Sequence, residues 1–222
     1  MDRYFAHMEE VASMAEAFVL NGDIFDFKWS EHGIFSRSVQ AAEHFLRKLA
    51  EDHPECHFHV VLGNHDAVPP YRRCLEELGG QHENLDWHEF ACQLEDRVFL
   101  HGDVIHAGSS NAALRAFRSR LQHPARGLTW HKWAHSAVHR SRVPWAAFRM
   151  LPKRLLAVRL LAYLETEDQL AAVLGHVRHI YFGHTHSDFE DFSFRSYCFH
   201  NCGSATHGAR LRLVTFPMKD SK

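Results

Sequence analysis

Short apolar runs, each made mostly of β-branched or aromatic residues, recur along the chain and predict buried strands. Four of them cover residues 17–20, 58–62, 98–100 and 180–182. Each run stops at a polar motif, and the four motifs are Gly22-Asp23, Gly63-Asn64-His65-Asp66, His101-Gly102-Asp103 and Gly183-His184-Thr185-His186. Because the carboxyl ends of strands in an open α/β sheet converge on one crevice, we expect these side chains to meet there.

The residue types in these motifs predict a metal site. A carboxylate, an amide oxygen and several imidazoles form a mixed oxygen and nitrogen set, which suits Mn, Fe(II) or Zn better than Ca or Mg. A pair of such ions can clamp a phosphoryl group and lower the pKa of a bound water. The adjacent glycines allow the backbone to turn sharply beneath the metal.

The order of the four motifs resembles that of the calcineurin-like metallophosphoesterases, over roughly residues 17–215. The segment Asn201-Cys202-Gly203-Ser204 is similar to the strand-ending Asn-Pro-Gly-Ser of many members, with Cys in place of Pro. The resemblance implies an α/β/β/α sandwich of two mixed sheets flanked by helices. It also implies hydrolysis of a phosphoester or pyrophosphate bond by a metal-activated hydroxide.

The resemblance further implies which side chains bind metal. Asp23 would bridge two metals, and His186 would bind the first of them. Asn64, His101 and His184 would complete the shell of the second metal. Two divalent metals are expected in the complete protein, with Mn favoured over Fe or Zn.

Two further residues have catalytic roles by the same resemblance. His65 is similar to the family's histidine that binds no metal, lies near the substrate phosphate and protonates the leaving oxygen. Asp66 would orient the His65 ring from behind.

The family's first motif, a strand ending in Asp-x-His that supplies two ligands of the first metal, has no match here. Residues 1–12 instead predict an amphipathic helix, whose apolar face carries Tyr4, Phe5, Met8, Val11 and Ala12. With five of the seven expected ligands, this chain would hold one metal or fewer. Either Met1 is an internal methionine of a longer protein, or the chain is a natural one-metal or non-catalytic relative.

Composition fits one domain spanning residues 1–222. The 222 residues are 45% hydrophobic and 23% charged, which is ordinary for a soluble globular protein. The sequence contains neither the apolar core of a signal peptide nor an apolar stretch long enough for a membrane span, so we expect a cytoplasmic protein. The five cysteines match no zinc or disulfide spacing, so we expect reduced core thiols; they are Cys56, Cys74, Cys92, Cys198 and Cys202.

Charge is concentrated in one segment, although the formal net charge is only -2. Residues 104–164 contain no Asp or Glu but eleven Lys and Arg residues. Because the segment follows a motif-bearing strand, we expect a basic helical cap, at about residues 104–166, that projects over the crevice and attracts an anionic phosphorylated substrate. Candidate substrate-binding residues in it are Arg149, Lys153, Arg154 and Arg159.

Residues 145–164 alternate apolar residues with these cations, which leaves two interpretations open. The segment is either a helix lying in an anionic membrane surface or a helix packed on the domain with its arginines in water. The insertion and the run from Asn21 to Phe27 resemble the UDP-2,3-diacylglucosamine hydrolases of lipid A synthesis. The chain departs from that branch at His65, where the branch carries arginine.

Other functions remain as alternatives. The chain could be a soluble phosphodiesterase or phosphatase of other specificity, or a non-catalytic interaction module of the same fold. Nucleic-acid binding is disfavoured, because the basic segment lacks aromatic residues interleaved in a known binding motif. His131, His135 and His139 have the spacing of a helical metal site, but a solvated basic face is the favoured interpretation. The sequence does not determine an oligomeric state.

Overall fold

The computed structural model describes residues 2–27, 35–121, 151–204 and 213–217. In chain order the first elements are α1 (Asp2–Ala12), β1 (Ala17–Asn21), α2 (Phe35–Asp52), β2 (His57–Val61), α3 (Pro69–Gln81), β3 (Leu85–His88), β4 (Ala91–Leu94) and β5 (Arg97–Leu100). The later elements are α4 (Val104–Ala107), α5 (Asn111–Leu121), α8 (Lys153–Thr166), α9 (Asp168–Val173), β6 (His179–Phe182), β7 (Asp188–Phe194) and β8 (Tyr197–Cys202). The four strands and the first helix expected from the sequence are all present, with boundaries shifted by at most one residue at each end.

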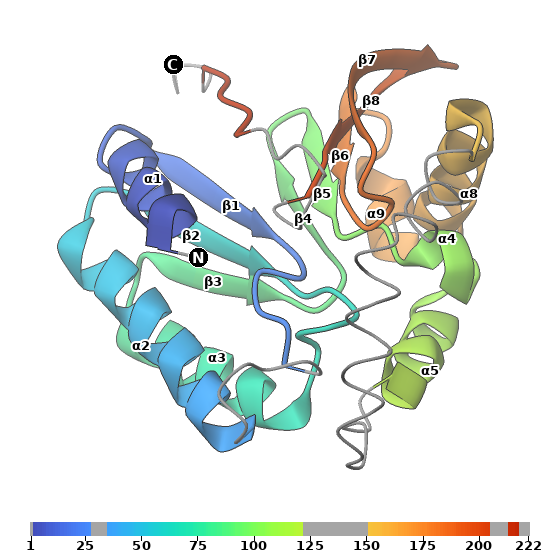
Figure 1. Cartoon of the computed structure of the whole chain (residues 1–222). Coiled ribbons are helices and arrows are strands. Elements are labelled where there is room, and N and C mark those ends of the chain that lie inside the picture. Colours follow the sequence, from blue (N-terminus) through green and yellow to red (C-terminus); the bar gives the residue numbers. More distant parts are fainter. Residues whose placement is uncertain (1, 28–34, 122–150, 205–212, 218–222) are drawn as a thin grey trace.

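Two sheets face each other between two layers of helices (Figure 1). The smaller sheet has the order β1-β2-β3 and is parallel throughout. The larger sheet has the order β4-β5-β6-β8-β7, in which β5, β6 and β8 are parallel and the outer strands β4 and β7 are antiparallel to their neighbours. This arrangement confirms the α/β class and the two flanked sheets expected from the sequence.

The outer face of each sheet is buried by its own helices. Against the smaller sheet, α2 contributes Val39, Ala42, Leu46 and Leu49, whose spacing of three and four residues places them on one helix face. Against the larger sheet, α4, α5 and α8 contribute to a second core that includes Leu114 and Leu160. Each sheet is therefore held by its own apolar layer.

The parallel connections place the four motifs at one edge of the sandwich. Helix α2 links the parallel strands β1 and β2, and the helices from α4 to α9 link the parallel strands β5 and β6. Strands joined in this way end at the same edge of their sheet. The carboxyl ends of β1, β2, β5 and β6 thus bring together residues that are up to about 160 positions apart, as the hydrogen bond from Asn21 Nδ2 to the Tyr181 carbonyl illustrates.

The basic insertion is described only in part, since residues 122–150, with Arg149 and the three spaced histidines, lie outside the described ranges. Helix α8 belongs to the helical layer over the larger sheet, where Leu156, Leu160 and Leu164 are buried. The packed interpretation is therefore the one that holds for residues 153–166. Within the described part of the chain, every helix is too short or too polar to cross a bilayer.

Candidate active site

The loops that follow β1 and β2 turn sharply, and glycine makes these turns possible. Gly22 and Asp23 both have positive φ angles, +77° and +52°, directly after the last residue of β1. A Cβ atom on Gly22 would overlap the ring of His101, and one on Gly63 would overlap the carboxylate and backbone nitrogen of Asp23. The two glycines therefore allow side chains of three different motifs to approach one another.

Polar atoms from three of the motifs converge on a ring nitrogen of the fourth. His101 Nε2 lies 3.0 Å from Asp23 Oδ2, 3.1 Å from Asn64 Oδ1 and 3.2 Å from His184 Nδ1. The imidazole nitrogen carries at most one hydrogen, so it can satisfy only one of these three neighbours. Four lone-pair-bearing atoms that face one another in this way fit a shared divalent cation, and their types suit Mn, Fe(II) or Zn.

The protonation of Asp23 and His184 agrees with that assignment, whereas His101 has to give up a proton when it binds a cation. Burial alone would raise the pKa of Asp23, but the charge and hydrogen bond of His101 hold it well below its usual value. Burial alone would lower the pKa of His101, but Asp23 raises it. Burial and the nearby His101 lower the pKa of His184 to about 3, so this ring is neutral, which is the form that binds metals.

His184 is held from its other side by a residue that the sequence did not single out. His106 Nδ1, on the short helix α4, lies 3.0 Å from His184 Nε2. Arg159 of α8 donates to the carbonyl oxygen of Ile105 at 2.8 Å, which places a cation next to this histidine pair. Contacts of this kind fix the orientation of a ligating ring.

His65 lies beside the convergent group and has a different partner from the one expected. Its backbone N–H donates to Asp23 Oδ1 at 2.7 Å, and its Nδ1 is 3.0 Å from Asp26 Oδ1. Burial would lower the pKa of His65, but the hydrogen bond with Asp26 and the charge of Asp23 raise it to about 9. Asp26 lies within the Asn21 to Phe27 run, where only the family likeness drew attention to it.

Asp66, expected to orient the His65 ring, joins two backbone loops. It accepts hydrogen bonds from the backbone N–H groups of Gly63 at 2.7 Å and Ile24 at 3.1 Å. Its side chain is buried, and burial together with the charge of Asp23 raises its pKa. Asp66 therefore fixes the relative positions of the loops after β1 and β2.

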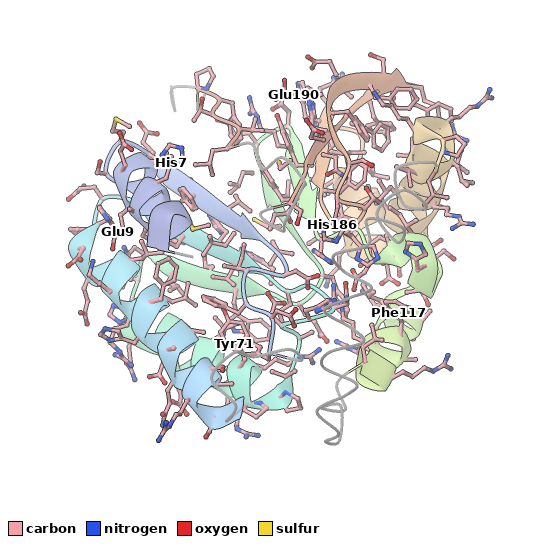
Figure 2. The ribbon with its side chains drawn as sticks, viewed as in Figure 1. His7, Glu9, Tyr71, Phe117, His186 and Glu190 are labelled. Carbon is pink, nitrogen blue, oxygen red and sulfur yellow. The ribbon has the colours of Figure 1, made fainter. Side chains whose placement is uncertain are left out.

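His186 lies in the middle of the molecule (Figure 2), two residues after His184 on the same loop. Among the described residues, the compact group of possible ligands at this site consists of Asp23, His101 and His184, without His186. The loop is held by buried Asn201, whose Nδ2 donates to the Gly183 carbonyl and to Thr185 Oγ1, each at 3.0 Å. The role of His186 as a ligand stays a prediction.

The cations of the insertion have different partners in the fold. Arg118, counted among the substrate-recruiting cations, has a side chain only 1% exposed and pairs with Asp103, so that expectation is wrong for this residue. Lys153 lies over the rings of Phe189 and Phe192, with its Nζ 4.5 Å from the first centroid. Of the three candidate substrate-binding cations in the described part of α8, Arg159 is the one bonded next to the His106 and His184 pair.

Comparison with known proteins agrees with the geometry of the site. A search of curated proteins found no match to this chain. The family model described as calcineurin-like phosphoesterase matches residues 2–188, which is well over half of the 222 residues. The chain therefore belongs to the calcineurin-like phosphoesterase family, whose members are metal-dependent phosphoester hydrolases.

Proposed function

We propose that this chain hydrolyses a phosphoester bond at the site formed by Asp23, Asn64, His101 and His184, with Mn²⁺ as the favoured cation. The observation that carries the proposal is the convergence of three polar atoms on His101 Nε2 within 3.2 Å. A bound divalent cation supplies Lewis acidity toward phosphoryl oxygens and lowers the pKa of a water molecule. In the complete protein, His186 would contribute to a second cation site, as the family likeness implies.

The chain's own residues account for binding and proton transfer. Asp23 and Asn64 offer oxygen ligands, and neutral His184 offers a ring nitrogen. His106 holds the His184 ring in place from its other side. His65 makes its contact with Asp26 through Nδ1, which leaves Nε2 as the atom that donates a proton to the leaving oxygen. Asp66 keeps the two ligand-bearing loops together through its bonds to backbone N–H groups.

The test compares two histidines of the same chain. The purified protein is freed of metal and titrated with Mn²⁺ by calorimetry, and hydrolysis of bis(4-nitrophenyl) phosphate is followed in parallel. His184→Gln should lose about tenfold or more in Mn²⁺ affinity together with turnover. His176→Gln, which changes an exposed histidine after α9, should retain both.

Unchanged Mn²⁺ affinity in His184→Gln would contradict the proposed site. If the wild-type chain binds Mn²⁺ through these residues yet hydrolyses neither a nitrophenyl monoester nor the diester, the non-catalytic alternative is favoured. Turnover of the monoester alone would assign a phosphatase rather than a phosphodiesterase.

We further propose an anionic substrate larger than a simple phosphoester, of the nucleoside-diphosphate-lipid type that the likeness to the UDP-2,3-diacylglucosamine hydrolases implies. Support comes from α8, where exposed Leu155 and Val158 alternate with Lys153, Arg154 and Arg159. Such a surface suits an anionic headgroup with an acyl chain. The reaction would then take place in the cytoplasm, at the inner face of an anionic membrane.

Arg159 provides the test of this substrate class. Arg159→Gln should raise KM several-fold more for a UDP-linked diacyl sugar than for the nitrophenyl diester, which makes little contact with α8. Arg178→Gln removes an exposed cation from the loop before β6 and serves as the control. Parallel loss of both activities in Arg159→Gln would show that this arginine is structural, and the substrate proposal would give way to a soluble phosphodiesterase or phosphatase.

A further inference from the structure

The layer between the two sheets contains histidines beside its apolar residues. Along β2, Phe58 and Val60 point into the helical core, whereas His57, His59 and Val61 belong to the opposite, inter-sheet face. The buried members of the cluster between the sheets, within the described ranges, are Val61, Cys92, Phe99 and Tyr181, and partly buried apolar residues pack around them. A polar group buried between two sheets lowers the stability of the fold unless it forms hydrogen bonds or binds a metal. The histidines there therefore require an explanation.

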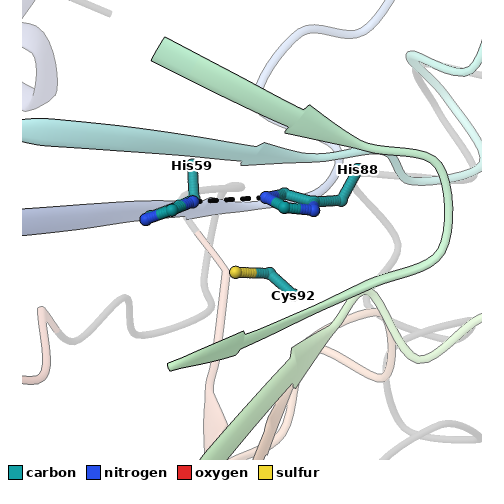
Figure 3. A group of neighbouring side chains, drawn as sticks. All are labelled: His59, His88 and Cys92. Carbon is teal, nitrogen blue, oxygen red and sulfur yellow. Dashed lines mark hydrogen bonds between the residues drawn. The ribbon is translucent and has the colours of Figure 1, made fainter. Parts of the chain in front are cut away.

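Two of these histidines and a buried cysteine meet at the corner where the chain passes from one sheet to the other (Figure 3). His59 lies on β2, His88 ends β3, and Cys92 lies on β4 of the larger sheet. His59 Nδ1 is 3.2 Å from His88 Nε2, and a ligand atom of each of the three residues lies within 4.8 Å of the other two. Cys92 is only 3% exposed and points into the group.

The spacing and the residue types fit one particular ion. Zinc is bound tetrahedrally by histidine nitrogens at about 2.0–2.1 Å, which places two such nitrogens about 3.3–3.4 Å apart. The distance between the His59 and His88 nitrogens, 3.2 Å, is close to that value. Two imidazoles and a thiolate also form a softer set than the one at the phosphoesterase site, and this difference favours zinc.

We propose that His59, His88 and Cys92 bind a Zn²⁺ ion, separate from the phosphoesterase site, that joins the smaller sheet to the larger one. The three residues leave the fourth tetrahedral position to a water molecule or a ligand from elsewhere. Binding forms one Zn–S bond and two Zn–N bonds and releases the thiol proton of Cys92 to solvent.

The surroundings of the group support this assignment. Burial lowers the pKa of His59 to about 4 and also lowers that of His88, so both rings are neutral and able to bind a metal. Burial raises the pKa of the Cys92 thiol to about 12, so the thiolate forms only with a cation beside it. His57, which bonds to Asp86 at 2.8 Å, stacks on the His59 ring and braces it from the solvent side.

A second group, formed by His179, Cys198 and His200, has the same residue types and provides a control for the proposed zinc site. Its residues lie on the neighbouring strands β6 and β8 of one sheet, and its thiol is half-buried with a contact to Asp191 Oδ1 at 3.7 Å. Binding there would not connect the sheets. Cys198 therefore supplies a control with the same ligand types at a different place.

Cobalt binding tests the proposed site directly, because a bound thiolate gives a characteristic absorption band. Metal-free, reduced full-length chain is titrated with Co²⁺, and the near-ultraviolet thiolate-to-cobalt absorption is recorded. The phosphoesterase site contains no thiol, so it does not contribute to this band, whatever the outcome there. Wild-type protein and Cys198→Ser should develop the band to the intensity of one thiolate-bound cobalt ion per chain, and Zn²⁺ should abolish it by displacement.

Cys92→Ser should remove the band, and His88→Gln should weaken the Co²⁺ binding that the band reports by about tenfold or more. His88 is half-buried, so His88→Gln keeps the test informative if Cys92→Ser folds poorly. Zn²⁺ should raise the Tm of wild type and Cys198→Ser by more than that of His88→Gln, in which the phosphoesterase site is the remaining proposed Zn²⁺ site. A band that is absent from wild type, persists in Cys92→Ser or disappears only in Cys198→Ser would overturn the proposal.

Discussion

Arg118 of α5 donates two hydrogen bonds to the Asp103 carboxylate, from Nε at 2.7 Å and from Nη2 at 3.0 Å, and each side chain is only 1% exposed. The same guanidinium donates to the backbone carbonyls of Glu89 and Leu62. One buried arginine thus connects the loop after β5, which carries the proposed ligand His101, with the end of β2. The position of His101 depends on this connection.

Removing that arginine should destabilise the protein strongly. Arg118→Met leaves the buried Asp103 carboxylate without its countercharge, so we expect a loss of about 3–5 kcal/mol in the free energy of unfolding. Arg115→Gln, three residues earlier on α5, removes a 58% exposed partner of Glu89 and should cost about 0–1 kcal/mol. Urea unfolding measures both changes. Similar losses in the two variants would contradict the role assigned to Arg118.

Two glycine substitutions should have opposite effects. Gly63→Ala would push a Cβ into the carboxylate and backbone nitrogen of Asp23, so the variant should lose both stability and Mn²⁺ binding. Gly80→Ala, near the end of α3, meets nothing within 4 Å and should stabilise the fold by about 0.4–1 kcal/mol. Thermal unfolding and calorimetric titration test the pair. Normal Mn²⁺ affinity in Gly63→Ala would show that the loop can relax around the added methyl group.

Glu89 should make the stability depend on pH. Its carboxylate contacts Arg72 of α3 at 2.9 Å and Arg115 of α5 at 2.6 Å, so it bridges the helical layers of the two sheets. Burial would raise the pKa of Glu89, but the hydrogen bond from Arg115 and the arginine charges lower it below the ordinary 4.5. Its stabilisation is therefore fully present above that value and is lost as the pH falls through the lower folded-state pKa.

The corresponding experiment compares wild type with Glu89→Gln in urea at several pH values. The stability advantage of wild type should shrink as the pH falls from about 6 to below 4. Glu165→Gln, which removes an exposed ion pair with Arg195, should show only a small difference throughout. An advantage of wild type that is independent of pH would mean that Glu89 contributes through packing rather than charge.

His65 should affect turnover without affecting metal binding. His65→Ala should lose about 10²-fold or more in kcat on an ester with a poor leaving group, the usual scale of general acid catalysis. The loss should be much smaller on a nitrophenyl ester, whose leaving oxygen hardly needs a proton. Asp26→Asn weakens the hydrogen bond to His65 Nδ1 and should show a milder form of the same pattern. A loss of Mn²⁺ affinity in His65→Ala would contradict the assignment.

Local patterns in the sequence determined much of the architecture. Short apolar runs identified β1, β2, β5 and β6, and the apolar stripe of residues 1–12 identified α1. Burial of one face of a helix or strand places apolar residues at regular intervals along the sequence. The motif after each run predicted that Asp23, Asn64, His101 and His184 lie close together, since parallel strands end at a common edge. These inferences need only the order of residues along a strand or a helix.

Other features depended on contacts between distant residues. Arg118 looks like any other cation of a basic segment until Asp103 and two carbonyl oxygens are seen to bury it. Asp26, rather than Asp66, faces the His65 ring, and the group of His59, His88 and Cys92 spans two sheets. Charge and residue type are local properties, but the free energy of a buried polar group depends on its partners, and only the packing of the sheets and helices selects them.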